Sequence, residues 1–184
     1  MSNHNILCVD LDGTLLKGDI SRHALYEFLK RKPWAFFNIL RLALKGSLAV
    51  KKELSKNVLL PPGPYIWNRY AIDYIQKMKA QGFYVYLATG APQRYAEQLI
   101  DKLPFTFDGC FGSTDCNLVG QNKALFLKNK FGSFTYMGNS WQDRFVFEVA
   151  DKIIAITTSS SLITWIQKQN KPYEIFPFIC TLHH

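Results

Sequence analysis

Two aspartates, Asp10 and Asp12, stand one residue apart at the end of a short apolar run in the stretch ILCVDLDGT. Side chains at positions i and i+2 leave an extended chain on the same side, so both carboxylates can face one site. Carboxylates this close repel each other, and burial makes each of them harder to ionise. A bound divalent cation removes that conflict, and oxygen ligands suit Mg²⁺. The spacing therefore predicts a carboxylate-based metal site.

Three further groups of polar residues follow, each beside a predicted strand end or helix start. Thr89 and Gly90 close the run YVYLATG, where a hydroxyl next to helix N–H groups can hold an anion. Lys123 opens a helical stretch, although most lysines simply face water. Asn139 and Asp143 follow the run YMG. Each signal is weak by itself, and their order along the chain gives them meaning.

In that order, the stretches DLDGT, YVYLATG, VGQNKALFL and YMGNSWQDR resemble the four motifs of the haloacid dehalogenase (HAD) superfamily of phosphohydrolases. The resemblance covers roughly residues 5–157. It implies that Asp10 is the nucleophile, which forms an aspartyl-phosphate with the substrate. It also implies that Asp12 is the general acid and base of the reaction.

The resemblance further implies which residues bind phosphate and metal. Thr89, Gly90 and Lys123 would hold the phosphate, and Thr89 and Lys123 would belong to the catalytic set. The expected Mg²⁺ ligands are Asp10, Asp12 through its main-chain carbonyl, Asn139 and Asp143. The chain departs from the family pattern at Asn139, where an aspartate is usual. An amide oxygen can coordinate Mg²⁺, but the site loses one negative charge.

The elements that must position these residues alternate between strand and helix along most of the chain. This alternation predicts an α/β fold, a three-layer α/β/α Rossmann-like parallel sheet. Strands are predicted at 5–10, 83–88, 107–113, 134–138, 152–157 and 173–176, and helices at 20–32, 33–46, 47–59, 65–81, 92–103, 121–130, 141–150 and 160–169.

Residues 19–61 interrupt the alternation, and we expect them to form a small helical cap inserted after the first strand. The catalytic core would then comprise residues 1–18 and 62–184, with the PPGP segment as a firm break. The insertion resembles the caps of part of the superfamily, which exclude water and select the substrate. Asp19 is predicted to be the N-cap of the first cap helix.

Taken together, the motifs and the helical block are similar to the soluble HAD domains fused to membrane prenyltransferases of the ubiquinone-biosynthesis type. This likeness implies a link to a membrane prenyltransferase and a lipid-linked or prenyl-linked phosphate as substrate, with a sugar phosphate also open. The predicted activity is Mg²⁺-dependent hydrolysis of a phosphomonoester. Phosphotransfer to an acceptor other than water would use the same residues. The alternative is a catalytically weak or inactive HAD-fold module for phosphate binding or membrane interaction, which Asn139 favours.

The insertion is both basic and apolar, and two interpretations follow. The segment from residue 30 to residue 56 could lie on an anionic membrane as a peripheral contact. Alternatively, its aromatic side chains pack on the catalytic core while its lysines face water. We favour packing, because amphipathic helices usually bury their apolar side in their own protein.

The chain of 184 residues carries a formal charge of +8, which favours anionic partners. It contains no recognisable nucleic-acid-binding motif, so nucleic acid is not an expected partner. The sequence MSNHNILCVD lacks the pattern of a signal peptide, and the longest apolar region is interrupted by Asn38, Arg41 and Lys45. The four cysteines are expected to be reduced thiols. We therefore expect a cytoplasmic protein, peripheral to the inner membrane face if the cap contacts lipid.

Overall fold

The centre of the molecule is a six-stranded sheet in the order β4-β3-β1-β5-β6-β7, with every neighbouring pair parallel. The computed structural model describes residues 5–60 and 65–181, so the predicted break at 61–64 lies outside the described residues. The strands are β1 (Ile6–Val9), β3 (Tyr84–Pro92), β4 (Gly109–Ser113), β5 (Thr135–Gly138), β6 (Lys152–Ile156) and β7 (Tyr173–Phe176).

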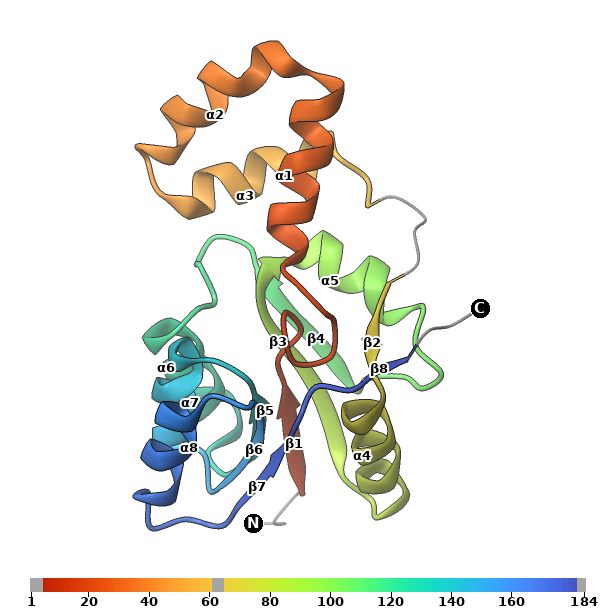
Figure 1. Cartoon of the computed structure of the whole chain (residues 1–184), viewed down its shortest axis with the longest axis vertical. Helices are drawn as coiled ribbons and strands as arrows, with labels where there is room; N and C mark the ends of the chain where they lie inside the picture. The colour runs from red at the N-terminus through yellow and green to blue at the C-terminus, as the bar shows by residue number, and fades with distance from the viewer. Residues whose placement is uncertain (1–4, 61–64, 182–184) are drawn as a thin grey trace.

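Helices cover both faces of the sheet, as Figure 1 shows. One face carries α4 (Arg69–Ala80) and α5 (Gln93–Ile100), and the other carries α6 (Gln121–Phe131), α7 (Arg144–Val149) and α8 (Ser160–Gln167). Side chains of β1 alternate between the two layers, because successive residues of a strand point to opposite faces. Leu7 and Val9 join the apolar cluster of α4 and α5, and Cys8 joins that of α6 to α8. The predicted three-layer α/β/α architecture is confirmed.

Three helices lie between β1 and the rest of the sheet in the chain and form a separate layer above the carboxyl ends of the strands (Figure 1). They are α1 (Ile20–Arg31), α2 (Phe36–Ala43), which follows the short 3₁₀ helix η1 (Pro33–Ala35), and α3 (Ser47–Asn57). The Asp19 side chain accepts a hydrogen bond from the Arg22 backbone N–H at 3.0 Å, which confirms the predicted N-cap.

A small apolar core holds the three helices together and joins them to α5. Ala24, Phe28, Ile39 and Leu54 from the cap cluster with Tyr95 of α5, and all five are buried. The aromatic side chains around α2 do not take part in this core. Trp34, Phe36 and Phe37 are exposed, so the expectation that the cap's aromatics pack on the core is wrong for these residues.

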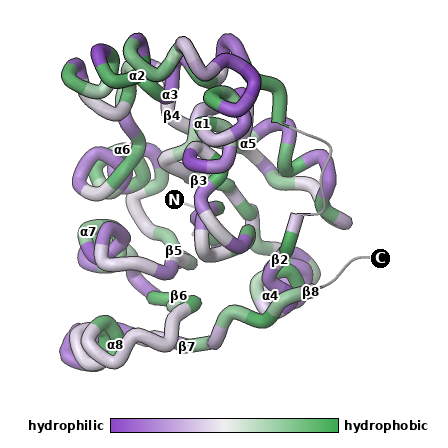
Figure 2. The backbone as a smooth tube through the Cα atoms, turned by 45° about the horizontal axis from the view of Figure 1, so that its top comes forward, coloured by the Kyte–Doolittle hydropathy of each residue, from purple (hydrophilic) through white to green (hydrophobic). Residues whose placement is uncertain are grey.

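The physical reason for this error is that α2 is apolar on two opposite faces. Ile39 and Leu42 turn toward the cap core, and the face that carries Phe37 and Leu40 stays outside it. Figure 2 shows hydrophobic stretches of α2 at the edge of the molecule. A cap of three short helices can cover only one of these faces.

The predicted helix at 65–81 is partly wrong, because it begins with two residues of strand. β2 (Trp67–Asn68) pairs antiparallel with β8 (Cys180–Thr181), and α4 follows directly. A two-residue strand has no periodicity that a sequence pattern could reveal. The predicted strand at 83–88 is also longer in the structure and runs through Thr89 to Pro92, with an irregularity in its pairing to β4 after Ala88.

The predicted helix at 141–150 begins as the 3₁₀ helix η2 (Trp141–Asp143) and continues as α7. All four cysteines carry free thiols, and Cys8 is fully buried. Within residues 5–60 and 65–181, no helix is long and apolar enough to cross a bilayer.

Candidate active site

Asp10 is the residue at which the central strand β1 meets the cavity below the cap. Its backbone N–H donates to the Met137 carbonyl at 2.9 Å, which continues the pairing of β1 with β5. Its side chain is buried, and Lys123 Nζ donates to Asp10 Oδ1 at 2.7 Å. Lys123 lies in the first turn of α6 and is itself only 4% exposed. Lys123 is therefore not one of the many lysines that face water.

The same ammonium group is part of a buried network that includes Tyr136 and Asp143. Lys123 Nζ donates to Tyr136 Oη at 3.0 Å and lies 3.6 Å from Asp143 Oδ1. The Tyr136 hydroxyl donates to the same Asp143 oxygen at 2.7 Å. One cation is therefore shared between two buried carboxylates, and a phenol holds one of them in place.

Asp143 is fixed further by the turn that precedes η2. Its Oδ2 accepts hydrogen bonds from the Asn139 N–H at 3.1 Å, the Ser140 N–H at 3.0 Å and the Ser140 hydroxyl at 2.9 Å. This reciprocal arrangement is a capping box, and it sets the position of Asp143 at the end of β5. Asn139 lies in the same turn, so the two predicted metal ligands are positioned together.

Asp12 lines the same cavity, where the chain turns from β1 into the cap. The turn places Gly13 at φ +75°, a conformation that favours glycine. Asp12 Oδ1 accepts a hydrogen bond from the Ile20 N–H at 2.9 Å, at the first residue of α1. Asp12 thus links the loop that carries Asp10 to the first helix of the cap.

Thr14 lies between the predicted nucleophile and the turn after β5. Its hydroxyl is 3.5 Å from Asp10 Oδ2 and 3.4 Å from Asn139 Oδ1. A Cβ atom on Gly13 would lie 2.1 Å from Asn139 Nδ2, so only glycine leaves room for the amide. The Asp10 and Asn139 oxygens therefore converge on one small polar space.

Burial and neighbouring charges set the charge state of the two aspartates. Burial raises the pKa of Asp10 to about 6, and the neighbouring Lys123 limits that rise. Burial and then the charge on Asp10 raise the pKa of Asp12 to about 7. Burial would lower the pKa of Lys123, but Asp10 and Asp143 outweigh it, so this pKa lies above its ordinary value. At neutral pH Lys123 is charged, and Asp12 holds a proton in part of the molecules.

These residues line a cavity of about 450 Å³ between the cap and the carboxyl ends of the strands. Six of the seven residues predicted for the site face it: Asp10, Asp12, Gly90, Lys123, Asn139 and Asp143. Thr89 does not line it. Thr89 is fully buried, and its hydroxyl accepts a hydrogen bond from the Ala91 N–H at 3.0 Å. The role of Thr89 in phosphate binding stays a prediction.

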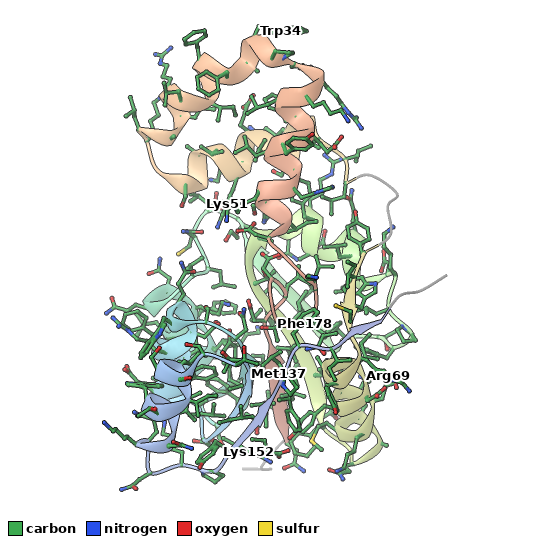
Figure 3. The ribbon with its side chains drawn as sticks, in the orientation of Figure 1. Trp34, Lys51, Arg69, Met137, Lys152 and Phe178 are labelled. Atoms are coloured by element: carbon green, nitrogen blue, oxygen red, sulfur yellow. The ribbon has the colours of Figure 1, made fainter. Side chains whose placement is uncertain are left out.

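Lys51 also lines the cavity, and sequence reasoning assigned it no role in the site. It comes from cap helix α3, and Figure 3 shows it on the side of the cap that faces the core. Its Nζ donates to the Gly90 carbonyl at 2.6 Å and to Asn117 Oδ1 at 2.8 Å. Its place three residues before the buried Leu54, on the same helix face, is the signal that could have identified it. Thr14 and Tyr136 were also missed: they lie within the stretches DLDGT and YMGNSWQDR, but sequence reasoning gave neither of them a role in the site.

The donor atoms of the residues around the cavity suit a hard divalent cation. Among the described residues no group of three or more His, Cys, Asp or Glu side chains could hold a metal, so carboxylates alone would not form the site. The cavity nevertheless is lined by Asp10, Asp143 and Asn139, which carry two carboxylates and an amide oxygen, and by Asp12, whose main-chain carbonyl is the further predicted ligand. All of these donors are oxygens, the ligand type that Mg²⁺ takes.

The parallel sheet, its two helical layers and the helical cap above Asp10 form a fold that the chain shares with several solved structures. The chain is similar to a HAD-superfamily hydrolase from Ehrlichia chaffeensis, with a TM-score of 0.52, 16% identity, and coverage of 91% of this chain and 98% of that one. It is also similar to a phosphoserine phosphatase solved as a phospho-aspartyl intermediate analogue. The TM-score is 0.58 at 16% identity, and the match covers 97% of this chain and 95% of that one. A protein of unknown function from Bordetella pertussis gives a TM-score of 0.64 at 15% identity, covering 94% of this chain and 98% of that one.

At the level of sequence, no protein-family model matches the chain. It is 30% identical over 152 residues to the uncharacterized protein y4nM of Sinorhizobium fredii, a match that covers 82% of this chain. The chain spans only 29% of the length of that relative. These comparisons establish the fold, and the activity has to be argued from the site.

Proposed function

We propose that the chain is a phosphatase that hydrolyses a phosphomonoester through an aspartyl-phosphate on Asp10. The observation that carries this proposal is the buried ion pair of Asp10 and Lys123, 2.7 Å long, at the end of the central strand. Burying a carboxylate and an ammonium group costs desolvation free energy that their attraction often fails to repay, so the stability of the fold alone is a weak reason for such a pair. A cavity that also holds Asp12 gives the pair another use.

In the first step, a carboxylate oxygen of Asp10 forms a bond to phosphorus while the bond from phosphorus to the leaving oxygen breaks. Asp12 donates its proton to that leaving oxygen. The raised pKa of Asp12, about 7, supports this role, because an ordinary aspartate would hold no proton at neutral pH. Lys123 keeps the phosphate and Asp10 together by offsetting their negative charges.

In the second step, water attacks the phosphorus and the bond to Asp10 breaks, which releases inorganic phosphate and restores the carboxylate. Asp12, now ionised, takes a proton from the attacking water. The cap closes one side of the cavity and limits the access of other water molecules. Thr89 and Gly90, at the end of the second motif, are proposed to contact the phosphate.

Mg²⁺ is the proposed cofactor, held by Asp10, Asn139, Asp143 and the main-chain carbonyl of Asp12. When bound, it would supply positive charge that offsets the repulsion between the carboxylates and the phosphate. The natural substrate stays a proposal: a lipid-linked, prenyl-linked or sugar phosphate. The link to a membrane prenyltransferase rests on the sequence resemblance alone.

The test is phosphate release from an aryl phosphate in the presence of Mg²⁺. Asp10→Asn should reduce turnover at least about a thousandfold, because the amide is a poor nucleophile. Asp73→Asn, on the exposed face of α4, is a matched control that should keep full turnover. Circular dichroism should show that both variants are folded. Undiminished turnover by Asp10→Asn would exclude the proposed mechanism.

Asn139 favours a second candidate, a module of the same fold that binds phosphate with little or no turnover. Replacing a usual aspartate with an amide removes one charge from the metal site, which weakens metal affinity. In that case, Mg²⁺ with beryllofluoride should raise the melting temperature of the wild type, while a broad panel of phosphate esters gives no phosphate release. Measurable release that depends on Asp10 would exclude this candidate.

A further inference from the structure

The outer end of the cap carries a set of exposed apolar side chains that no described residue covers. We call this set the cap tip: Trp34, Phe36, Phe37, Leu40 and Leu44. Their exposed fractions are 74%, 52%, 77%, 52% and 85%. Phe36, Leu40 and Leu44 follow one another at intervals of four and form a single line along α2.

The cap tip lies at the far end of the cap from the catalytic core, as the position of Trp34 in Figure 3 shows. Helix α1, with 12 residues, begins beside Asp12 and ends next to the tip, a rise of about 18 Å. The tip is therefore no part of the cavity that holds Asp10. A role for it must be sought outside the catalytic site.

The surroundings of the cap tip are strongly basic. No acidic residue occurs in the sequence between Glu27 and Glu53. Within the described part of the chain, Arg31 forms an ion pair of 3.9 Å with Glu27. No ion-pair partner there contacts the other four basic residues beside the tip, which are Lys30, Lys32, Arg41 and Lys45. The exposed cations around the tip are Lys30, Arg31, Lys32, Arg41 and Lys45.

We propose that the cap tip binds the surface of an anionic lipid bilayer, with the apolar side chains in the headgroup boundary and the cations on lipid phosphates. Aromatic side chains favour this boundary, and each nearby Lys or Arg adds attraction to anionic lipid. A second copy of the chain is a poorer occupant, because the two tips would bring like charges together. Nucleic acid would satisfy the cations but leave the five apolar side chains unpaired. This proposal does not depend on the phosphatase activity.

The test is co-sedimentation of the full chain with lipid vesicles. The wild type should pellet with vesicles of three parts phosphatidylcholine to one part phosphatidylglycerol, and should stay in solution with phosphatidylcholine alone. The emission of Trp34 should shift to shorter wavelength on binding, and Trp34→Phe should remove that shift. Raising the salt concentration should weaken binding, since it screens the attraction to lipid.

Two double variants separate the apolar and the charged contributions. Trp34→Ser with Phe37→Ser should reduce partitioning at least about tenfold. Arg41→Gln with Lys45→Gln should reduce it about thirtyfold, at about 1 kcal/mol for each charge. The matched controls lie on the catalytic core. Leu125→Ser with Tyr173→Ser is the control for the apolar variant, and Lys77→Gln with Lys128→Gln is the control for the charge variant. Both controls should bind as the wild type does, and all variants should keep the wild-type turnover.

Three results would overturn the proposal. One is a wild type that does not pellet with anionic vesicles. A second is a Trp34→Ser/Phe37→Ser variant that pellets as strongly as its Leu125→Ser/Tyr173→Ser control. The third is a concentration-dependent dimer in sedimentation velocity that the tip variant abolishes, without vesicle binding by the wild type. That last result would assign the tip to contact between two copies.

Discussion

At the scale of single residues, the site depends on one cation that serves two buried carboxylates. Lys123 donates to Asp10 at 2.7 Å and lies 3.6 Å from Asp143. The Tyr136 hydroxyl donates to Asp143 at 2.7 Å and so limits its movement. Asp12 forms no ion pair among the described residues, and burial together with the charge on Asp10 raises its pKa to about 7. The two aspartates of the first motif therefore differ in their surroundings: Asp10 is an ion-paired carboxylate, and Asp12 is a group able to hold a proton.

Asn139 gives a prediction at this scale, because the motif that this stretch resembles has an aspartate there. Asn139→Asp would add a carboxylate near Asp10 and Asp143. In the metal-free protein, this charge should lower the melting temperature, since the added carboxylate repels its neighbours. Mg²⁺ should bind at least about tenfold more tightly, as an opposite charge is added close to the ion. Titration calorimetry measures the affinity directly.

A control for that experiment is Asn129→Asp, which adds the same charge at an exposed position of α6. It should change neither Mg²⁺ affinity nor stability noticeably. If Asn139→Asp binds Mg²⁺ no more tightly than Asn129→Asp does, Asn139 does not belong to the metal site.

At the scale of elements, most of what positions the site could be predicted from sequence. The carboxyl ends of parallel strands meet at one edge of a sheet, so motifs at the ends of β1, β3 and β5 converge there without knowledge of any contact. This reasoning brought Asp10, Gly90 and Asn139 to one cavity. It could not find Lys51, which reaches the cavity from another layer, because the docking of a cap on a core is a long-range contact.

The short sheet of β2 and β8 was also out of reach, although it supports the site. Asn68 in β2 is fully buried, and its Nδ2 donates to the Thr14 carbonyl at 3.0 Å. Its Oδ1 accepts from the Ile179 N–H at 3.3 Å. One asparagine thus ties the loop after β1 to the last described segment of the chain. The two residues of β2 carry no periodic signal within a stretch that otherwise predicts helix.

Tyr95 provides a prediction about the contact between the cap and α5. It is fully buried in the cap core, and its hydroxyl has no hydrogen-bond partner among the described residues. Burial raises the pKa of this phenol to about 12. A buried hydroxyl without a partner costs about 1–3 kcal/mol. Tyr95→Phe should therefore raise the free energy of unfolding by about 1 kcal/mol, which urea denaturation can measure.

Tyr70→Phe is the matched control, because the Tyr70 side chain is 42% exposed and water can satisfy its hydroxyl. That change should leave the free energy of unfolding nearly unaltered. A loss of stability in Tyr95→Phe would mean that the hydroxyl has a hydrogen-bond partner in the folded protein, against the packing described above.

At the scale of the whole molecule, the two proposed functions belong to separate parts of the structure. The core and the inner side of the cap enclose a cavity with Asp10, and the outer end of the cap presents apolar and basic side chains (Figures 1 and 3). Lys51 connects the two parts by donating to the Gly90 carbonyl at 2.6 Å. The sequence favoured burial of the cap aromatics. The structure leaves them exposed, because three short helices cannot cover both faces of α2.

The central claim is that Asp10 accepts a phosphoryl group from the substrate. The most direct measurement uses Asp12→Asn with an aryl phosphate, whose leaving group departs without a proton. Asp12 is then missing only as the base for the second step, so the intermediate should accumulate. Mass spectrometry of the digested protein should find the peptide with Asp10 heavier by one phosphoryl group, and the Asp10→Asn/Asp12→Asn variant should lack it. A wild type that releases phosphate while this peptide stays unmodified in Asp12→Asn, or carries the group on another residue, would contradict the account.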